Sequence, residues 1–323
     1  MNTYFCPTTL QQAVKIASMT FDQPIPIQEI AQKINAEIIG DATAIATGIN
    51  EIHQVRPGDI TFVDVKKYFE KSLSSAATFV ILNERVEAPA GKTLLLCADP
   101  FMAYNSIVLQ HRPYQPLQNS ISPLAEIDPS AIIEPNVVIG PYVKIGANSH
   151  IMANVTIAEH TLIGEEVIVQ PGAIIGTDAF YFKRSAEGFF KWRSGGRVIL
   201  EDRVDVGAGC TINKGVSGDT LIGAGTKLDS QVHIGHDVVV GKRCLFAAQV
   251  GIGGNCVIGD DVILYGQVGI AQNLHIGNKV VVLAKSGVSK DLEEGKVYFG
   301  YPAQEARTAY KELAMLRRIT NEK

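Results

Sequence analysis

Residues 237–290 read DVVVGK RCLFAA QVGIGG NCVIGD DVILYG QVGIAQ NLHIGN KVVVLA KSGVSK, nine consecutive units of six with no residue left over. The fourth place of every unit is apolar, as at Val240, Phe246 and Val288, and the fifth is mostly Gly or Ala. A period of six is typical of a hexapeptide β-helix. Each unit supplies one short strand and one corner, and three units close a triangular coil with the second and fourth side chains inside. The segment therefore predicts a parallel β-helix.

Stacking the coils sorts the outward-facing residues into columns. Residues 18 apart lie above one another at the inter-strand spacing of about 4.8 Å. One column of third places holds His233, Gly251, Gly269 and Gly287. Glycine weakens a strand and often marks a place where something approaches the backbone closely. Turn formation accounts for glycines at the fifth place but not at the third, so we interpret this column as a ligand groove.

A neighbouring column of sixth places carries the residues that suggest catalysis. It holds His236, Gly254, Gln272 and Lys290. An imidazole held by a carboxylate can act as a general base near neutral pH, and Asp229 is the carboxylate that we expect beside His236. The backbone N–H of Gly254 can face an oxyanion without obstruction by a side chain. A base, an oxyanion donor and an apolar groove favour direct acyl transfer to an amine or a hydroxyl.

The patterns outside this segment predict a mainly β chain with several parts. These are an N-terminal extension (1–22), an α/β domain (23–112), a proline-marked linker (113–125), hexapeptide repeats (126–302) and a C-terminal helix (303–323). A loop at 178–197 interrupts the repeats and is rich in aromatic residues. Long loops inside compact folds are usually functional. We expect this loop to pack across a neighbouring subunit, near the histidine face.

Composition restricts the classes of function. The chain has 323 residues and a net charge of −4, which argues against nucleic acid as a partner. Three of its five cysteines, Cys210, Cys244 and Cys256, take inward second places and are interpreted as core residues rather than disulfides or metal ligands. We recognise no signal peptide and no apolar run of membrane-spanning length. A cytoplasmic protein is expected.

The stretch from about residue 25 to 320 resembles the UDP-3-O-(3-hydroxyacyl)glucosamine N-acyltransferases of lipid A biosynthesis. The matching motifs are ITFVDVKKY (60–68), GRVILEDRVDVGAGCTINKG (196–215), GDTLIG (218–223) and the segment around His236. Many acyltransferases share the hexad pattern, whereas the N-terminal domain with its Phe-to-Tyr spacing is much more specific.

This resemblance implies a fold, a reaction and partners. The fold is a homotrimer of left-handed parallel β-helices, each with a small N-terminal α/β domain and a C-terminal helix. The reaction moves a long 3-hydroxyacyl chain from acyl carrier protein to the 2-amino group of UDP-3-O-acylglucosamine. The phosphopantetheine thioester of the carrier is the donor, and no further cofactor or metal is expected. Contact with the membrane is expected to be peripheral, through lipid products only.

The resemblance also assigns roles to single residues. His236 matches the general base, Asp229 its carboxylate partner and Gly254 the oxyanion donor. Phe62 and Tyr68 match an aromatic pair that stacks on uracil, with ordinary core packing as the alternative for both.

Further residues complete the expected site. Gln272-Asn273 stands where the family usually has a Gly-His pair, with His275 two residues on, and Gly287 falls near the position that limits acyl-chain length. The expected sets are an acceptor lining (Ser230, His233, Gln272, Asn273, His275), an acyl groove (Gly251, Gly269, Gly287) and contacts to acyl carrier protein (Lys290, Arg317, Arg318).

Three other functions stay open on the sequence. A coenzyme A-dependent sugar acetyltransferase has the same repeats, but its small donor does not need a long glycine strip. A metal enzyme on this fold would use His233, His236 and His275 from adjacent subunits. A non-catalytic paralogue would keep the fold without the chemistry.

Overall fold

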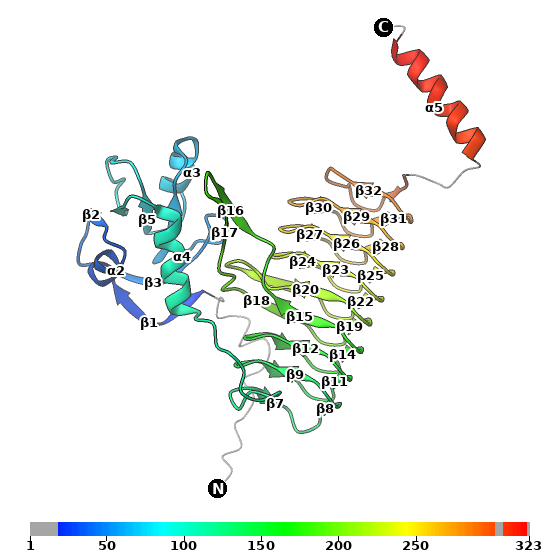
Figure 1. The fold of residues 1–323 in the computed structure, drawn as a ribbon, viewed down its shortest axis with the longest axis horizontal. Coiled ribbons are helices and arrows are strands. Elements are labelled where there is room, and N and C mark those ends of the chain that lie inside the picture. The colour runs from blue at the N-terminus through cyan, green and yellow to red at the C-terminus, as the bar shows by residue number, and fades with distance from the viewer. Residues whose placement is uncertain (1–18, 301–305, 322–323) are drawn as a thin grey trace.

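The computed structural model describes residues 19–300 and 306–321. An α/β domain lies beside a long triangular β-helix, and helix α5 (Ala306–Asn321) follows the last coils (Figure 1). Three parallel sheets of eight, nine and eight strands form the sides of the prism. The predicted mainly β class and the stacked hexads are therefore confirmed, while the left-handedness of the coil stays an inference from the resemblance.

We name the three sides by the order in which the chain reaches them. The first face contains β7 (Glu126–Ile127), β10 (Lys144–Ile145), β13 (Leu162–Ile163), β18 (Arg197–Leu200), β21 (Asp219–Ile222), β24 (Val239–Val240), β27 (Val257–Ile258) and β30 (His275–Ile276). The second face contains β8 (Ile132–Ile133), β11 (His150–Ile151), β14 (Ile168–Val169), β19 (Asp205–Val206), β22 (Lys227–Leu228), β25 (Leu245–Phe246), β28 (Ile263–Leu264), β31 (Val281–Val282) and β33 (Val297–Tyr298). The third face contains β9 (Val138–Ile139), β12 (Thr156–Ile157), β15 (Ile174–Thr177), β20 (Thr211–Asn213), β23 (His233–Ile234), β26 (Gly251–Ile252), β29 (Gly269–Ile270) and β32 (Gly287–Val288).

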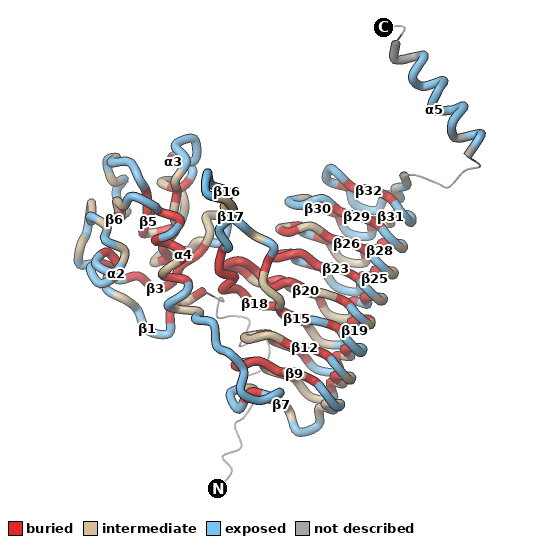
Figure 2. Tube along the Cα trace, in the orientation of Figure 1, coloured by how far each residue is buried: buried red, intermediate tan, exposed pale blue. Residues whose placement is uncertain are grey.

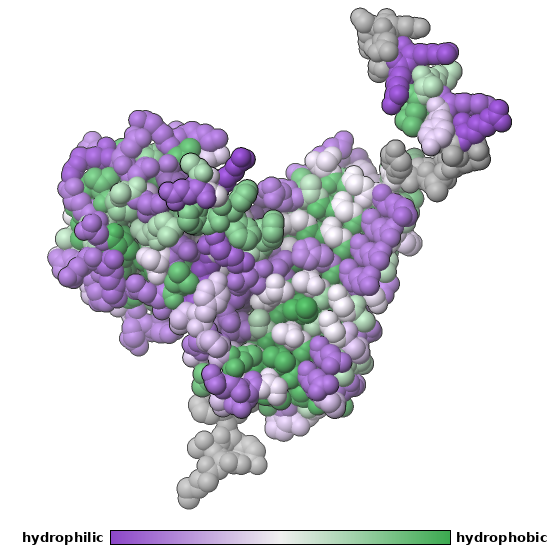
Figure 3. Space-filling model, viewed as in Figure 1, coloured by the Kyte–Doolittle hydropathy of each residue, from purple (hydrophilic) through white to green (hydrophobic). Residues whose placement is uncertain are grey.

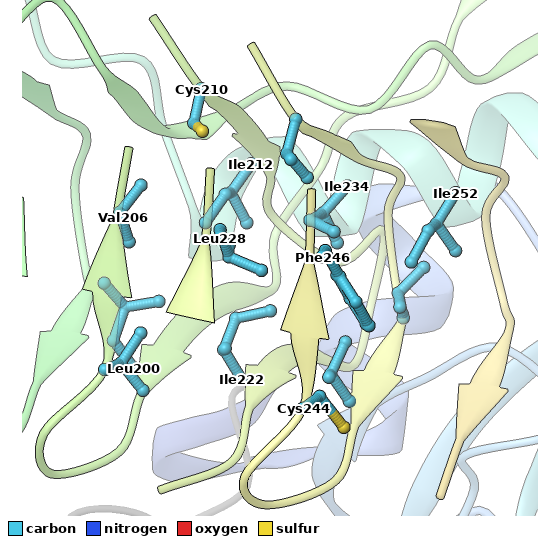
Figure 4. Close-up of a cluster of buried hydrophobic side chains, with 14 of the residues drawn as sticks. Leu200, Val206, Cys210, Ile212, Ile222, Leu228, Ile234, Cys244, Phe246 and Ile252 are labelled. Carbon is cyan, nitrogen blue, oxygen red and sulfur yellow. The ribbon is translucent and has the colours of Figure 1, made fainter. Parts of the chain in front are cut away.

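The inside of the prism is one continuous apolar column. Side chains from all three faces converge there, among them Phe246 (Figure 4), and buried segments recur along the coils in Figure 2. Phe246 is 1% exposed and Val288 is 7% exposed. Burying one large aliphatic side chain contributes roughly 1.5–3 kcal/mol, so the repeat of inward residues is the main source of stability. Cys210, Cys244 and Cys256 belong to this column, as expected. Burial raises the pKa of the Cys244 thiol to about 11, so this thiol is protonated at neutral pH.

The corners of the coils have a conformation that the hexad pattern did not predict. Every hexad from 237 to 290 begins with a residue at positive φ, from Asp237 at 56° to Lys285 at 61°. This left-handed conformation costs roughly 1–2 kcal/mol for an L-residue. The corner N–H groups bond across coils, as from Asn255 N to the His236 carbonyl at 2.9 Å, and this offsets part of the cost.

The N-terminal domain is built on a six-stranded sheet in the order β1-β3-β4-β5-β6-β2. Its strands are β1 (Thr20–Pro26), β2 (Glu37–Ile39), β3 (Ile45–Ile49), β4 (Asp59–Val63), β5 (Phe79–Leu82) and β6 (Thr93–Leu96). Its helices are α2 (Ile27–Lys33), the 3₁₀ turn η1 (Lys66–Tyr68), α3 (Phe69–Leu73) and α4 (Pro100–His111). The Asp99 carboxylate caps α4 by accepting from the Met102 N–H at 3.0 Å.

The predicted boundary of this domain at residue 23 is wrong. Strand β1 begins at Thr20, and Met19 and Phe21 are 0% and 5% exposed. The domain therefore includes residues that the sequence pattern assigned to the extension, because their apolar side chains complete its core. Residues 1–18 of the predicted extension lie outside the described residues.

The loop at 178–197 joins the two parts of the chain. It contains the hairpin β16 (Phe182–Ser185) and β17 (Gly188–Lys191), which lies between the N-terminal domain and the coils in Figure 1. Trp192 packs against Phe62, with ring centroids 5.3 Å apart, and against Phe101, at 5.1 Å. The loop thus packs on its own N-terminal domain, which supplies the aromatic partners of Trp192. Its expected contact with a neighbouring subunit stays a prediction.

No helix among the described residues has the length and apolar character to cross a membrane.

Candidate functional site

A groove of about 680 Å³ runs along the third face, and its floor is made of glycine. His233, Gly251, Gly269 and Gly287 lie in register on successive strands from β23 to β32. A Cβ built on any of these three glycines meets no atom within 4 Å, so the space exists because side chains are missing. Apolar and near-neutral surface covers the upper coils around β26 and β29 in Figure 3. The predicted column is confirmed as a groove.

His236 stands at the head of this groove, at the corner after β23, and it is 9% exposed. Its Nδ1 lies 3.0 Å from Oδ2 of Asp237. Asp237 takes the left-handed corner position and is 7% exposed, because the unit at 215–218 covers its carboxylate. The carboxylate partner of the histidine is therefore the next residue in the chain.

The expected pairing of His236 with Asp229 is wrong within one chain. Asp229 lies at the corner after β22, where its Oδ1 accepts the Ser230 N–H at 2.7 Å. A residue seven positions upstream falls on the previous corner of the triangle, because one hexad fills one side. Ser230 lies at that corner too, so neither residue lines the groove of the same chain.

Backbone groups fix the Asp237 carboxylate. Oδ2 accepts the Val216 N–H at 2.7 Å, and Oδ1 accepts the Gly218 N–H at 3.0 Å. Both donors come from the short unit at 215–218 that shifts the hexad frame. Since the carboxylate is an acceptor, His236 Nδ1 carries the proton and Nε2 is left as a hydrogen-bond acceptor.

Gly254 and Tyr181 enclose the imidazole. A Cβ on Gly254 would lie 2.5 Å from His236 Nε2, so only glycine fits there. No hydrogen bond from the Gly254 N–H is found among the described residues, so this group is open to a ligand. The Tyr181 ring lies 5.1 Å from the imidazole ring at an angle of 57°. The predicted base and the predicted oxyanion donor are thus brought together.

The remaining predicted acceptor residues divide into two groups. His233 and Gln272 line the groove. Asn273 takes a left-handed corner at φ 63° and does not line it. His275 is on the first face, where its N–H donates to Asp291 at 2.8 Å beside a separate hollow. The chain turns a corner of the triangle between Gln272 and His275. The expectation that His275 lines the His236 site is therefore wrong within a chain.

Several residues near the site were not predicted from the sequence. Asn213 and the 88%-exposed Phe180 line the end of the groove near β20. Glu51, from the N-terminal domain, donates its N–H to Ser217 Oγ at 3.1 Å. Burial, and then the charge of Asp237, raises the pKa of Glu51 to about 8. Asp237 was detectable from its place directly after the histidine, whereas no local pattern marks Glu51.

A buried ion cluster holds the aromatic loop against the coils. Glu159 Oε1 lies 2.7 Å from Lys214 Nζ and 2.8 Å from the Arg193 guanidinium. Burial opposes the charge on Glu159, but these two cations lower its pKa to about 2. Lys214 also lies 3.1 Å from Asp178 at the start of the loop. The cluster fixes the loop that carries Phe180 and Tyr181.

The two aromatic residues expected to hold uracil differ in environment. Phe62 is half-buried and contacts Trp192 and Tyr104. Tyr68 is 48% exposed, with the Lys67 ammonium 4.6 Å above its ring. Tyr68 therefore lies at the surface, and Phe62 packs its ring against the core.

The described residues contain no cluster of three or more His, Cys, Asp or Glu side chains that could hold a metal. Lys290, Arg317 and Arg318 are exposed at the C-terminal end of the chain.

Known proteins match both parts of the chain. Residues 45–109 match the family model described as UDP-3-O-(3-hydroxymyristoyl) glucosamine N-acyltransferase, and residues 142–177 and 219–254 match bacterial transferase hexapeptide repeats. A UDP-3-O-acylglucosamine N-acyltransferase of Granulibacter bethesdensis is 38% identical over 240 residues, covering 67% of this chain and 70% of the relative. One of Syntrophotalea carbinolica is 37% identical, covering 66% and 68%. A crystal structure of a UDP-N-acetylglucosamine acyltransferase superposes with a TM-score of 0.52 at 30% identity, over 60% of this chain and 75% of that one.

Proposed function

The chain belongs to the UDP-3-O-acylglucosamine N-acyltransferases, acyltransferases of lipid A biosynthesis, and on this premise we propose how its residues perform the reaction. The acceptor is the 2-amino group of UDP-3-O-acylglucosamine, and the donor is a long 3-hydroxyacyl thioester on acyl carrier protein. The amine attacks the thioester directly, without a covalent enzyme intermediate. Burial of the cysteine thiols in the core supports direct attack, since none of Cys210, Cys244 and Cys256 faces the groove.

His236 is the general base of the proposed reaction. Its Nε2 takes a proton from the amine as the new C–N bond forms, and Asp237 stabilises the resulting imidazolium through Nδ1–H. The Gly254 N–H donates to the oxyanion of the tetrahedral intermediate. The C–S bond then breaks, and the imidazolium returns its proton to the departing thiolate. The products are the amide and the free thiol of the carrier.

The two substrates occupy different surfaces in this proposal. The acyl chain lies along Gly251, Gly269 and Gly287, and the nucleotide stacks on Tyr68 with Phe62 behind it. Carrier proteins of this kind are acidic, and Lys290, Arg317 and Arg318 supply exposed positive charge for docking.

The single observation that carries the proposal is the head of the groove, where the His236–Asp237 pair meets Gly254 above an open glycine floor. The test is incubation of the protein with UDP-3-O-acylglucosamine and acyl carrier proteins loaded with chains of different length. Mass spectrometry should find the N-acylated sugar with a long 3-hydroxyacyl donor. Transfer of an acetyl group from acetyl-coenzyme A instead would overturn the proposal, and so would the absence of any product with every donor.

A further inference from the structure

Glu51 reaches the surroundings of His236 from the N-terminal domain, and the reaction above does not use it. It lies in the turn after β3 and is half-buried. Its N–H donates to Ser217 Oγ at 3.1 Å, and Ser217 Oγ lies 3.5 Å from Glu51 Oε2. The Tyr181 side chain lies close enough to this carboxyl for each of the two groups to shift the pKa of the other. One side chain therefore contacts the unit that holds Asp237 and the ring beside His236.

We propose that Glu51 is a positioning residue for the His236–Asp237 pair and that it acts through Tyr181 and Ser217, without touching substrate. The inference rests on the proposed function, because it assigns His236 as the base.

The first route runs through Tyr181. Its ring lies 5.1 Å from the imidazole on one side and 4.9 Å from Trp192 on the other. Contact of its hydroxyl end with Glu51 restrains displacement of the ring away from the histidine. A Tyr181 ring held in this way keeps His236 against Gly254.

The second route is electrostatic and runs through Asp237. Burial first, and the Asp237 charge second, raises the pKa of Glu51 to about 8, although the Ser217 and Tyr181 hydrogen bonds oppose this rise. At pH 7 Glu51 therefore mostly keeps its proton, and Asp237 is the carboxylate that contacts the imidazole. Ionisation of Glu51 above pH 8 adds a second negative charge to this environment.

Other titratable groups face the same space. Tyr104 of α4 and Tyr181 have pKa values raised by burial, and the pKa of His53, in the same turn as Glu51, is lowered by burial. These three groups stay neutral around pH 8. Lys71 of α3 faces His53. Glu51 is therefore the group whose ionisation near pH 8 is expected to affect His236.

Nuclear magnetic resonance of protein with ¹³C-labelled histidine tests this directly, with the His236 signal assigned by its loss in His236→Gln. The wild-type Cε1 shift of His236 should follow its own titration and then show a second inflection near pH 8. Glu51→Gln should remove the second inflection, and the control His53→Asn should keep it. A wild-type titration without the second inflection, or its survival in Glu51→Gln, overturns the proposal. Because this readout needs no acyl transfer, it fails independently of the proposed function.

Kinetics supply the second arm. Glu51→Ala should lower kcat roughly 10–100-fold, the scale of a small misplacement of a reacting group, with little change in KM for the UDP-sugar. Glu51→Gln, which restores a neutral hydrogen-bonding side chain, should recover most of that loss at pH 7. A change in KM alone would make Glu51 an acceptor-binding residue and contradict the positioning role.

Discussion

The environment of His236 is assembled from an adjacent residue, the next coil and a distant loop. Asp237 follows it directly, Gly254 comes from the next coil, and Tyr181 comes from the inserted loop. The hexad pattern identified Gly254, because neighbouring residues in one column of the prism are a fixed number of positions apart in the sequence. It misplaced the carboxylate, since it gave no information on the contact between Asp237 and the short unit at 215–218.

Replacement of the base should abolish most of the activity. His236→Ala is expected to lower kcat about 10²–10⁴-fold with the fold intact, which is the usual contribution of general acid–base catalysis. His275→Ala is the matched control, because this histidine lies on the first face. Rates of both variants with acyl carrier protein donors decide the assignment, and loss of activity in His275→Ala alone would reverse it.

Of the two carboxylate variants, Asp237→Asn should lower kcat more than Asp229→Asn, because Asp237 is the carboxylate that contacts His236 within the chain.

The exposed Tyr68 ring should serve the nucleotide. Tyr68→Ala is expected to weaken binding of the UDP-sugar by about 1–3 kcal/mol, the measured worth of stacking one base on an aromatic ring. Titration calorimetry with the UDP-sugar measures this, and saturation by the donor should not change. Phe62→Ala is the less informative variant because it also removes contacts to Trp192. Unchanged nucleotide affinity in a folded Tyr68→Ala protein would assign both rings to packing.

The raised pKa of Glu51 makes stability depend on pH. The ordinary value is 4.5, and the folded value is about 8. Between these values the unfolded chain ionises Glu51 while the folded chain keeps the proton, so this group lowers wild-type stability progressively from pH 4.5 to 8 and no further above it. The Tm of Glu51→Gln relative to wild type should therefore rise across that window. Thermal unfolding at pH 4.5, 6 and 8 tests the trend, and a difference in Tm that stays flat would contradict it.

At the scale of elements, the repeat could be predicted because one geometric rule governs every coil. Inward second and fourth places of 237–290 are buried except at Leu274, which is partly buried, and β15 ends at Thr177, where the hexad frame stops. The path of the 178–197 loop could not be predicted in the same way. Its position depends on Trp192 meeting Phe62 and Phe101, a contact between segments that share no periodicity.

The glycine column should set the length of the acyl chain. Gly287 lies three coils below His233, roughly 14 Å at the inter-strand spacing. Gly287→Met should reject the longest donors and still accept shorter ones, whereas Gly251→Leu or Gly269→Leu should block all long donors. Each of these positions has open space for a side chain, so the fold should tolerate the change. Donor profiles by mass spectrometry provide the comparison, and identical profiles for wild type and Gly287→Met would place the chain elsewhere.

At the scale of the whole molecule, the two parts of the chain meet at the site without enclosing it. The outer faces of the coils carry exposed apolar side chains, among them Leu245 at 47%, Val257 at 43% and Ile174 at 42%. Apolar side chains distributed over all three faces of the prism suit burial against other copies of the chain.

We therefore predict a homotrimer with its sites between subunits. A trimer would cover these faces and supply the second wall that the open groove lacks. In such an assembly the corner that holds Asp229 and Ser230 can contribute to a neighbour's site. Multi-angle light scattering at micromolar concentration should give three times the chain mass, and a monomer under those conditions would contradict the prediction.

The stacked coils divide the groove floor into steps of equal length, and this spacing has a consequence for the donor. Each coil adds about 4.8 Å, whereas an extended hydrocarbon chain advances about 1.3 Å per methylene, so one coil corresponds to about four carbons. A side chain can close the groove only at a coil, and the chain lengths that this scaffold separates best should differ by about that number. Selection among neighbouring chain lengths then depends on how far the side chain at the closing coil projects, which allows donor preference to change by substitution at one position while the fold is kept.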